Sequence, residues 1–233
     1  MSYFFTPQMP EDGILRGSIV DHLISTRIQS DQVFNITNLQ GSRWQVKLIR
    51  IDKKFRTAHI SLIEFEYIKR SIAYPRINNT LIQAQIDKSY LEKMFEILPF
   101  SLFDKVVLFR SQYSPKQEIN LDRLDKILTR SLEQSEQVYK PEIIISQDSL
   151  NQLILNCTKD NKLSLVLSTQ LTKSSIDNTN TTANVKTFDN EVVWIGPEGG
   201  WSQAELNLFN EQFRYINLGA TIYPAWLCSL AIR

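Results

Sequence analysis

The sequence predicts an α/β protein in which a small β-barrel domain precedes a larger domain of alternating strands and helices. Two observations predict this architecture. From residue 17 to residue 66 the chain offers short runs rich in Val, Ile, Phe and Thr between polar breaks, which is typical of β-hairpins. From residue 81 onward, short apolar runs alternate with amphipathic stretches of helical period, the pattern of α/β domains. We expect the domains to span 1–74 and 75–233.

In the first domain the pattern predicts three strands and one short helix. The expected strands cover residues 32–37, 42–51 and 57–65, and the helix covers 20–27. The breaks between the strands, at 38–41 and 52–56, are polar or contain glycine. Neighbouring strands are therefore expected to pair as hairpins.

In the second domain strands and helices alternate up to a long polar stretch. Strands are expected at 81–86, 105–109, 142–145 and 164–167, and helices at 89–97, 121–138 and 149–157. Residues 172–190 are rich in Asn, Thr, Ser and Lys. Such a composition buries little apolar surface, so we expect a surface loop there.

Composition excludes several classes of protein. With 42% hydrophobic and 22% charged residues, the chain matches a globular protein rather than a disordered or fibrous one. No apolar run approaches the roughly 20 residues of a membrane span. The first ten residues lack the features of a secretory signal, so we expect a cytoplasmic protein.

The few cysteines and histidines argue against a metal or disulfide framework. The chain has Cys157 and Cys228, far apart and flanked by apolar residues, and only His22 and His59 besides. We expect both cysteines to be small core residues. No metal-ligand spacing can be assembled from these four residues, so no metal is expected.

The charges are distributed unevenly along the chain. Residues 1–76 hold 11 Lys and Arg against 7 Asp and Glu, although the whole chain has a net charge of only +1. A basic small domain is typical of a phosphate-binding module. An ordinary solvated surface gives the same pattern, so both interpretations stand.

The most specific segment follows the apolar strand expected at 192–195. That strand runs directly into Gly-Pro-Glu-Gly-Gly at 196–200, followed by Trp201. Ser202 and Glu205 have the spacing of a capping box, in which each side chain accepts a hydrogen bond from the other residue's amide. We therefore expect a helix from residue 203 to about 213 and a strand at 215–218.

The glycines at 196–200 predict a ligand site. They stand at the carboxyl end of an expected parallel strand, where open α/β sheets bind nucleotide-like ligands, and glycine lets a ligand approach the backbone. Three glycines also make plain turns, and that alternative remains. The spacing is neither GxGxxG nor a Walker loop, which disfavours dinucleotide and triphosphate binding. A second strand-to-loop transition at Leu218 and Gly219 is expected to help clamp the ligand.

These residues resemble the RsmE-type uracil-N3 methyltransferases of 16S ribosomal RNA, which belong to the SPOUT class of trefoil-knotted methyltransferases. The strongest match is the segment IGPEGGWS at 195–202, followed by Leu218-Gly219. Upstream, Glu133-Gln134-Ser135 and Pro141-Glu142-Ile143 are similar to the family's EQS and PEI. Tyr3-Phe4-Phe5, His22-Leu23, Arg27 and Asp31 are similar to the start of its PUA-like barrel.

The resemblance implies a trefoil-knotted SPOUT domain after a PUA-like β-barrel, S-adenosylmethionine as methyl donor, and a homodimer. It implies 16S rRNA or the small ribosomal subunit as partner, and no membrane. The residues expected to bind the donor are Leu167, Ile195, Gly196, Pro197, Glu198, Gly199, Gly200, Leu218, Gly219 and Ile222. The candidate RNA contacts are Arg16, Arg27, Arg43, Arg50 and Arg76, each of which on its own is more often a solvated surface charge.

One departure from the family concerns residues 221–228. Where the family has RILRTETA, this chain has Thr-Ile-Tyr-Pro-Ala-Trp-Leu-Cys, so both arginines and the glutamate are absent. Uracil N3 loses a proton as it is methylated, and the developing negative charge favours a cationic partner. Two hypotheses follow: a methyltransferase whose catalytic groups come from elsewhere, or a non-catalytic RNA-binding or ribosome-assembly protein. The sequence assigns no catalytic residue.

Overall fold

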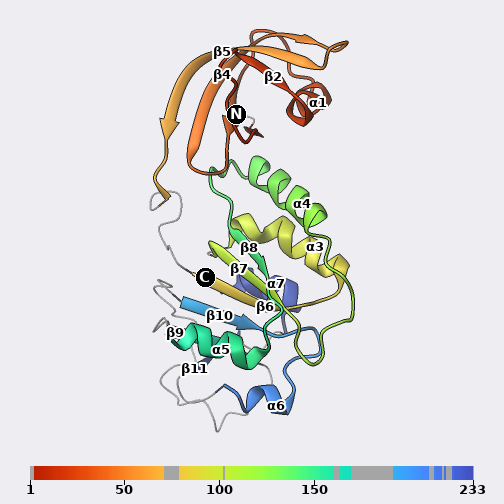
Figure 1. Cartoon of the computed structure of the whole chain (residues 1–233), viewed down its shortest axis with the longest axis vertical. Coiled ribbons are helices and arrows are strands. Elements are labelled where there is room, and N and C mark those ends of the chain that lie inside the picture. Colours follow the sequence, from red (N-terminus) through yellow and green to blue (C-terminus); the bar gives the residue numbers. More distant parts are fainter. Residues whose placement is uncertain are drawn as a thin grey trace. The chain divides into compact units, whose positions relative to one another are not determined.

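The computed structural model describes residues 3–70, 79–101, 103–159, 163–168, 191–209, 213–216, 218 and 222–232. The chain divides into two compact units (Figure 1). The first contains Met1–Pro75 and Leu128–Lys140, and the second contains Arg76–Ile127 and Pro141–Arg233. The expected barrel domain therefore gains a segment, 128–140, that composition does not point to.

The first unit is built on a curled five-stranded sheet of the PUA-like kind, which confirms the predicted fold of this part (Figure 1). Its strands are β1 (Tyr3–Phe5), β2 (Ile14–Arg16), β3 (Val33–Thr37), β4 (Ser42–Asp52) and β5 (Thr57–Tyr67), in the order β1-β3-β4-β5-β2. The three longer strands are the predicted ones. Helix α1 (Ser18–Ser25) lies between β2 and β3 in sequence.

The core of this unit comes from alternate residues of the sheet and one face of α1. Phe4, Phe34 and Leu48 from three strands contact Val20 and Leu23 of the helix, and all five are at most 1% exposed. Alternate strand residues point to one face of a sheet, so the curled sheet closes around these side chains.

The end of helix α4 (Leu121–Gln134) completes the first unit. Glu133 accepts a hydrogen bond of 2.7 Å from the Phe5 amide, and its second oxygen lies 3.5 Å from His22 Nδ1. Burial raises the pKa of the Glu133 carboxyl above its usual value. The Glu133-Gln134-Ser135 motif thus has a structural role here, because its glutamate connects the helix to β1.

Helix α4 ends at Gln134, four residues before the predicted end. Glu136 takes a left-handed φ of 57°. The Gln137 amide donates to the Leu132 carbonyl and the Glu136 amide to the Glu133 carbonyl. This is a Schellman ending, and it was not predicted because glutamate instead of glycine takes the left-handed position.

The second unit contains a six-stranded parallel sheet, as the predicted α/β fold requires. Its strands are β6 (Thr80–Ala84), β7 (Lys105–Phe109), β8 (Glu142–Ile145), β9 (Leu163–Leu167), β10 (Glu191–Ile195) and β11 (Phe213–Ile216), in the order β11-β9-β10-β6-β7-β8. Its other helices are α3 (Lys88–Ile97), a 3-10 turn (Leu98–Phe100), α5 (Leu150–Lys159), α6 (Gln203–Leu206) and α7 (Ala225–Ala231).

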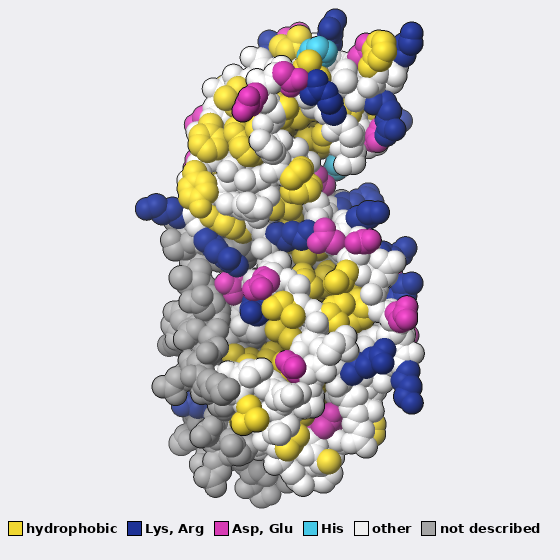
Figure 2. All heavy atoms as spheres, viewed as in Figure 1, with side chains coloured by type: hydrophobic (Ala, Val, Ile, Leu, Met, Phe, Trp, Pro, Cys, Tyr) yellow, Lys and Arg dark blue, Asp and Glu magenta, His cyan; other side chains and the backbone are white. Residues whose placement is uncertain are grey.

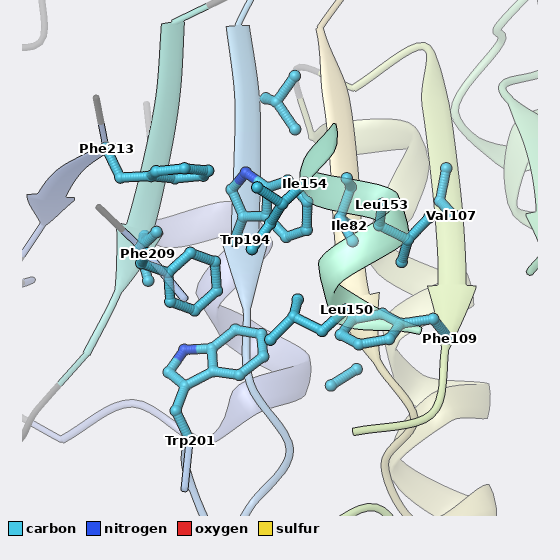
Figure 3. Packing of buried hydrophobic residues seen from close by; sticks show 13 residues of the cluster. Ile82, Val107, Phe109, Leu150, Leu153, Ile154, Trp194, Trp201, Phe209 and Phe213 are labelled. Atoms are coloured by element: carbon cyan, nitrogen blue, oxygen red, sulfur yellow. The ribbon is translucent and has the colours of Figure 1, made fainter. Parts of the chain in front are cut away.

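An aromatic cluster fills the space between the sheet and α5 (Figure 3). Trp194 of β10 is fully buried, and the rings of Phe209 and Phe213 meet it edge to face with centroids 5.7 and 5.9 Å away. Leu150 and Ile154 of α5 belong to the same cluster. Helices α3 and α7 pack against each other on the opposite face of the sheet (Figure 1).

The helix predicted to reach residue 213 is wrong in length. Helix α6 ends at Leu206, and tight turns follow, in which the Leu208 and Phe209 amides donate to carbonyls three residues earlier. Phe209 is 5% exposed within the aromatic cluster. Burying this ring stabilises the fold more than a longer helix would. Strand β11 begins at Phe213, two residues before the predicted start.

Two predictions fall partly outside the described residues. The loop expected at 172–190 lies outside them. The predicted trefoil knot depends on the paths of two segments, 169–190 and 219–221, and both also lie outside the described residues. Among the described helices, none has both the length and the apolar composition that a membrane span needs. The described residues also hold no group of three or more His, Cys, Asp or Glu placed to bind a metal.

Candidate ligand site at the glycine loop

The glycine loop, residues 196–200, leaves the carboxyl end of β10, an inner strand of the parallel sheet. β10 pairs with β9 on one side and with β6 on the other, and β6 pairs with β7. The carboxyl ends of all four strands meet at this edge, where open α/β sheets bind ligands. The structure therefore places the predicted residues Leu167 and Ile195 on adjacent strands at one edge.

Gly196 begins the loop at a crowded position. A Cβ atom there would lie 3.2 Å from the indole ring of Trp201. The Gly196 carbonyl accepts a hydrogen bond of 3.2 Å from Gln83 Nε2. An added Cβ would therefore require the Trp201 ring to shift by a few tenths of an ångström.

Gln83 is a candidate ligand contact that sequence analysis missed. It lies on β6, opposite Ile195, and is fully buried. Its Nε2 donates to the carbonyls of Ala84 and Gly196, whereas its Oε1 has no hydrogen-bond partner among the described residues. A buried acceptor without a partner is costly, so this atom is a suitable acceptor for a donor group of a ligand. A glutamine inside an apolar strand was the available signal.

The turn of the loop depends on Gly199 and Gly200. Gly200 has a left-handed φ of 73°, and its amide donates to the Pro197 carbonyl at 2.8 Å. A Cβ on Gly199 would lie 3.4 Å from the Tyr113 Cβ. Tyr113 follows β7, so the segment after that strand lies directly against the glycine loop.

The predicted capping box is confirmed and has an additional role. The Ser202 amide donates to Glu205 Oε2 at 2.9 Å, and the Glu205 amide donates to Ser202 Oγ at 3.2 Å. The other carboxylate oxygen, Oε1, accepts a hydrogen bond of 2.8 Å from the Gln112 amide. Glu205 is 7% exposed, so one buried carboxylate joins the start of α6 to the segment after β7.

Trp201 connects the loop to a third strand. Its Nε1 donates to the Leu167 carbonyl at 3.0 Å, at the end of β9. Its ring is stacked with that of Phe109 at the end of β7 and packs edge to face against Phe209 (Figure 3). The loop is thus supported from β7 and β9 by an almost fully buried indole.

Glu198 faces helix α7. Its carboxylate accepts a hydrogen bond of 3.4 Å from the Ala225 amide, directly after Pro224. Leu218 is half-buried, and Ile222 is 80% exposed. Gly219 lies outside the described residues. The structure therefore brings Glu198 to the segment after β11, but it does not place Ile222 in a buried wall.

Cys228 of α7 is buried, and Cys157 packs half-buried against the aromatic cluster. Burial, and next the negative charge of Glu198, raise the pKa of the Cys228 thiol to about 11. The thiolate is the reactive form, so at pH 8 alkylation should be on the order of 100-fold slower than for an exposed cysteine of ordinary pKa. The rate should rise with pH up to about 11.

This can be measured with iodoacetamide and mass spectrometry on a Cys157→Ser variant, with the unfolded chain as reference. Glu198→Gln removes one cause of the raised pKa, so it should speed the reaction modestly. Equal rates for the folded and unfolded chain would contradict this account of Cys228.

The candidate RNA-binding arginines are not gathered into one site. Arg16 pairs with Asp12 at 2.7 Å, and Arg43 pairs with Glu66 and also donates to the Tyr3 hydroxyl. Arg50 lies 3.5 Å from His59. Arg27, with a left-handed φ of 57°, is exposed after α1, and Arg76 lies outside the described residues. Their predicted role stays a prediction.

The fold and the site together define a two-domain α/β protein with a PUA-like domain and a glycine loop at the strand ends of a parallel sheet. Residues 74–223 match the RNA methyltransferase domain family. This match covers more than half of the sequence, and the chain belongs to that family. No curated protein matches the sequence.

Several solved structures share the fold over nearly the whole chain. A probable rRNA-methyltransferase from Porphyromonas gingivalis has a TM-score of 0.79 and 19% identity, covering 99% of this chain and 94% of its own. Ribosomal RNA small subunit methyltransferase E from Neisseria gonorrhoeae, bound to S-adenosylmethionine, has a TM-score of 0.73 and 19% identity with the same coverage. A proposed methyltransferase from Legionella pneumophila, in complex with the same cofactor, has a TM-score of 0.74 and 16% identity, with coverage of 98% and 93%.

Proposed function

We propose that this protein transfers a methyl group from S-adenosylmethionine to N3 of a uridine in 16S rRNA. The observation that carries the proposal is the glycine loop, which is braced from three neighbouring strand ends beside the buried Gln83 oxygen. Membership of the RNA methyltransferase family supports it. A similar fold in the Neisseria enzyme, which was solved with S-adenosylmethionine, supports the choice of donor.

The residues of the site suit an adenosyl ligand. The loop at residues 196–200 offers backbone amide and carbonyl groups to a ligand, and the Gln83 Oε1 is an acceptor for an amino or hydroxyl donor. We assign donor binding to Leu167, Ile195, Gly196, Pro197, Glu198, Gly199, Gly200, Leu218, Gly219 and Ile222, with Gln83 added to them. When bound, the sulfonium supplies an electrophilic methyl group.

Methylation at N3 needs a proton acceptor and a group that stabilises negative charge on the uracil. The bond from sulfur to methyl breaks, a bond from methyl to N3 forms, and the N3 proton leaves to a base. Glu198 is the carboxylate of the loop, and it already accepts the Ala225 amide. Its position suits holding α7 beside the loop, and the base remains unassigned.

A non-catalytic RNA-binding or ribosome-assembly protein is the second candidate. It is favoured by the segment 222–232, which contains no Lys or Arg and whose helix begins after Pro224. A cation from another helix lies beside α7: Lys93 of α3 places its ammonium 5.6 Å from the centre of the Trp226 ring. A working enzyme without the family's arginines would need such a replacement.

We also propose the trefoil knot, the homodimer and the cytoplasmic location that the resemblance implies. Membership of the RNA methyltransferase family supports both the knot and the dimer. Light scattering of the purified protein distinguishes a dimer from a monomer.

Calorimetric titration with S-adenosylmethionine tests the site. We expect micromolar binding by the native chain and a loss of at least about tenfold in Gly199→Val, because the added methyl groups press on Tyr113 and push the glycine loop out of position. Gly199→Ala places its Cβ at an ordinary contact distance, 3.4 Å, and should fold and bind more nearly like the native protein.

The reaction itself is tested by transfer of labelled methyl to unmethylated small subunits, with the modified base identified by mass spectrometry. Incorporation at uridine N3 would support the enzyme. Donor binding without transfer at saturating protein would favour the non-catalytic candidate, and absence of donor binding in a folded protein would contradict the proposed site.

A further inference from the structure

The turn between β4 and β5, residues 53–56, carries an exposed aromatic ring among cations. Phe55 is 69% exposed, and Lys53, Lys54 and Arg56 are exposed beside it. Figure 2 shows Lys and Arg side chains at this end of the first unit, where Figure 1 places the tip of the hairpin. We call residues 50–59 the hairpin tip.

The hairpin tip has a defined conformation. One oxygen of Asp52 accepts hydrogen bonds from the Lys54 and Phe55 amides, at 3.0 and 3.1 Å. Arg56 takes a left-handed φ of 50°, and its Nε donates to Asp21 of α1 at 3.0 Å. These contacts hold the turn against α1 and direct positions 53–55 away from the core, so the exposed ring is displayed at low entropic cost for a partner.

The charge of the hairpin tip favours an anionic partner. Arg50, Lys53, Lys54 and Arg56 face two carboxylates, Asp52 and Asp21, both of which are engaged in the contacts just described. Among the described residues, neither Lys53 nor Lys54 has a carboxylate within ion-pair distance. The Lys54 ammonium lies 5.5 Å from the centre of the Phe55 ring, which leaves one face of the ring for another contact.

We propose that the hairpin tip binds unpaired nucleotides of the RNA substrate, with a base stacked on Phe55 and phosphates held by Lys53 and Lys54. Exposed aromatic rings between cations are how proteins bind single-stranded nucleic acid, because every base has a face to stack and every nucleotide a phosphate. The proposal rests on the proposed function for its partner, but its site lies in the first unit. Its proposed contacts, Phe55, Lys53 and Lys54, were not among the candidate RNA-binding residues of the sequence analysis, although Arg50, which was, lies in the same hairpin tip.

The test measures the affinity of the full chain for an in vitro transcript of the small-subunit rRNA, in the absence of methyl donor. Phe55→Ala and Phe55→Leu should each weaken binding about tenfold, because both remove the stacking face. The double variant Lys53→Ala, Lys54→Ala should lower the slope of log affinity against log salt by about 1.4, the value for two phosphates of a single strand. Phe100→Ala, an exposed ring of the second unit, is the matched control and should bind like the native chain.

Affinity for S-adenosylmethionine should stay unchanged in all these variants, which shows that the second unit is intact. Native-like RNA binding by the Phe55 and lysine variants would overturn the hairpin proposal and leave the proposed methylation untouched. Conversely, weakened RNA binding in these variants with no methyl transfer by the native chain would support the hairpin tip and contradict the proposed reaction. If Phe55→Ala instead reduces retention on phosphatidylserine vesicles but not on RNA, the tip is a membrane contact and the RNA proposal is overturned.

Discussion

Replacing Glu205 with glutamine is expected to weaken S-adenosylmethionine binding at least tenfold and to destabilise the fold by about 2–4 kcal/mol. The carboxylate accepts hydrogen bonds from the Ser202 amide, the Ser202 hydroxyl and the Gln112 amide. A glutamine at this buried position has one acceptor oxygen, so its NH₂ group must face at least one of these donors. Either the cap of α6 or the connection to the segment after β7 is then lost.

The effect on affinity follows from which parts Glu205 joins. The Gln112 segment leads into Tyr113, which lies against Gly199, so a loosened Gln112 widens the space beside the glycine loop. Calorimetry and thermal unfolding measure the two effects. Gln203→Ala, on the same helical turn but exposed, is the control and should change neither by much. Unchanged donor affinity in Glu205→Gln would show that the glycine loop keeps its geometry without this carboxylate.

Truncating Trp194 to alanine is expected to cost about 3–5 kcal/mol, the usual range for a fully buried aromatic ring. The cavity would open between β10 and α5, where Phe209, Phe213 and Ile154 surround the indole (Figure 3). Phenylalanine should be tolerated much better, because the Trp194 Nε1 has no hydrogen-bond partner among the described residues. Replacement by phenylalanine removes that buried donor together with part of the ring.

Chemical denaturation followed by circular dichroism, with Trp226→Ala as a half-buried control, checks the order of these effects. Trp194→Phe should also keep its affinity for S-adenosylmethionine, since the glycine loop is supported through Trp201. A Trp194→Phe variant as unstable as Trp194→Ala would mean that the shape of the indole matters more than its unsatisfied N–H group.

Local patterns predicted most of the elements, and the misses have physical causes. Strands such as β7 and β8 have the predicted bounds because their apolar runs are short and end at polar residues. Strands β1 and β2 were missed because each has three residues, and β1 is held by parallel pairing with β3, 32 residues away. The end of α6 depends on the ring of Phe209 entering a tertiary cluster, which no helical pattern contains.

The candidate site was likewise predicted in its local parts and missed in its long-range contacts. The glycine loop and its capping box lie within ten residues, so their chemistry is readable in the sequence. The supports of the loop are distant in sequence: Glu205 meets Gln112, Trp201 meets Leu167, and Gln83 meets Gly196. Such contacts depend on strand order, and for one of them the sequence held a signal that was not used, a glutamine within an apolar strand.

The hydrogen bond between Phe5 and Glu133 joins residues 128 positions apart within the first unit. During synthesis, therefore, the amino-terminal sheet leaves the ribosome long before the helix end that completes it. This unit cannot reach its final state as an independent early domain, although proteins usually fold from the amino terminus as they are made. A fragment cut after residue 75 would expose the surface of β1 that residues 128–140 cover, whereas a fusion that restores this helix end would supply the missing side chains.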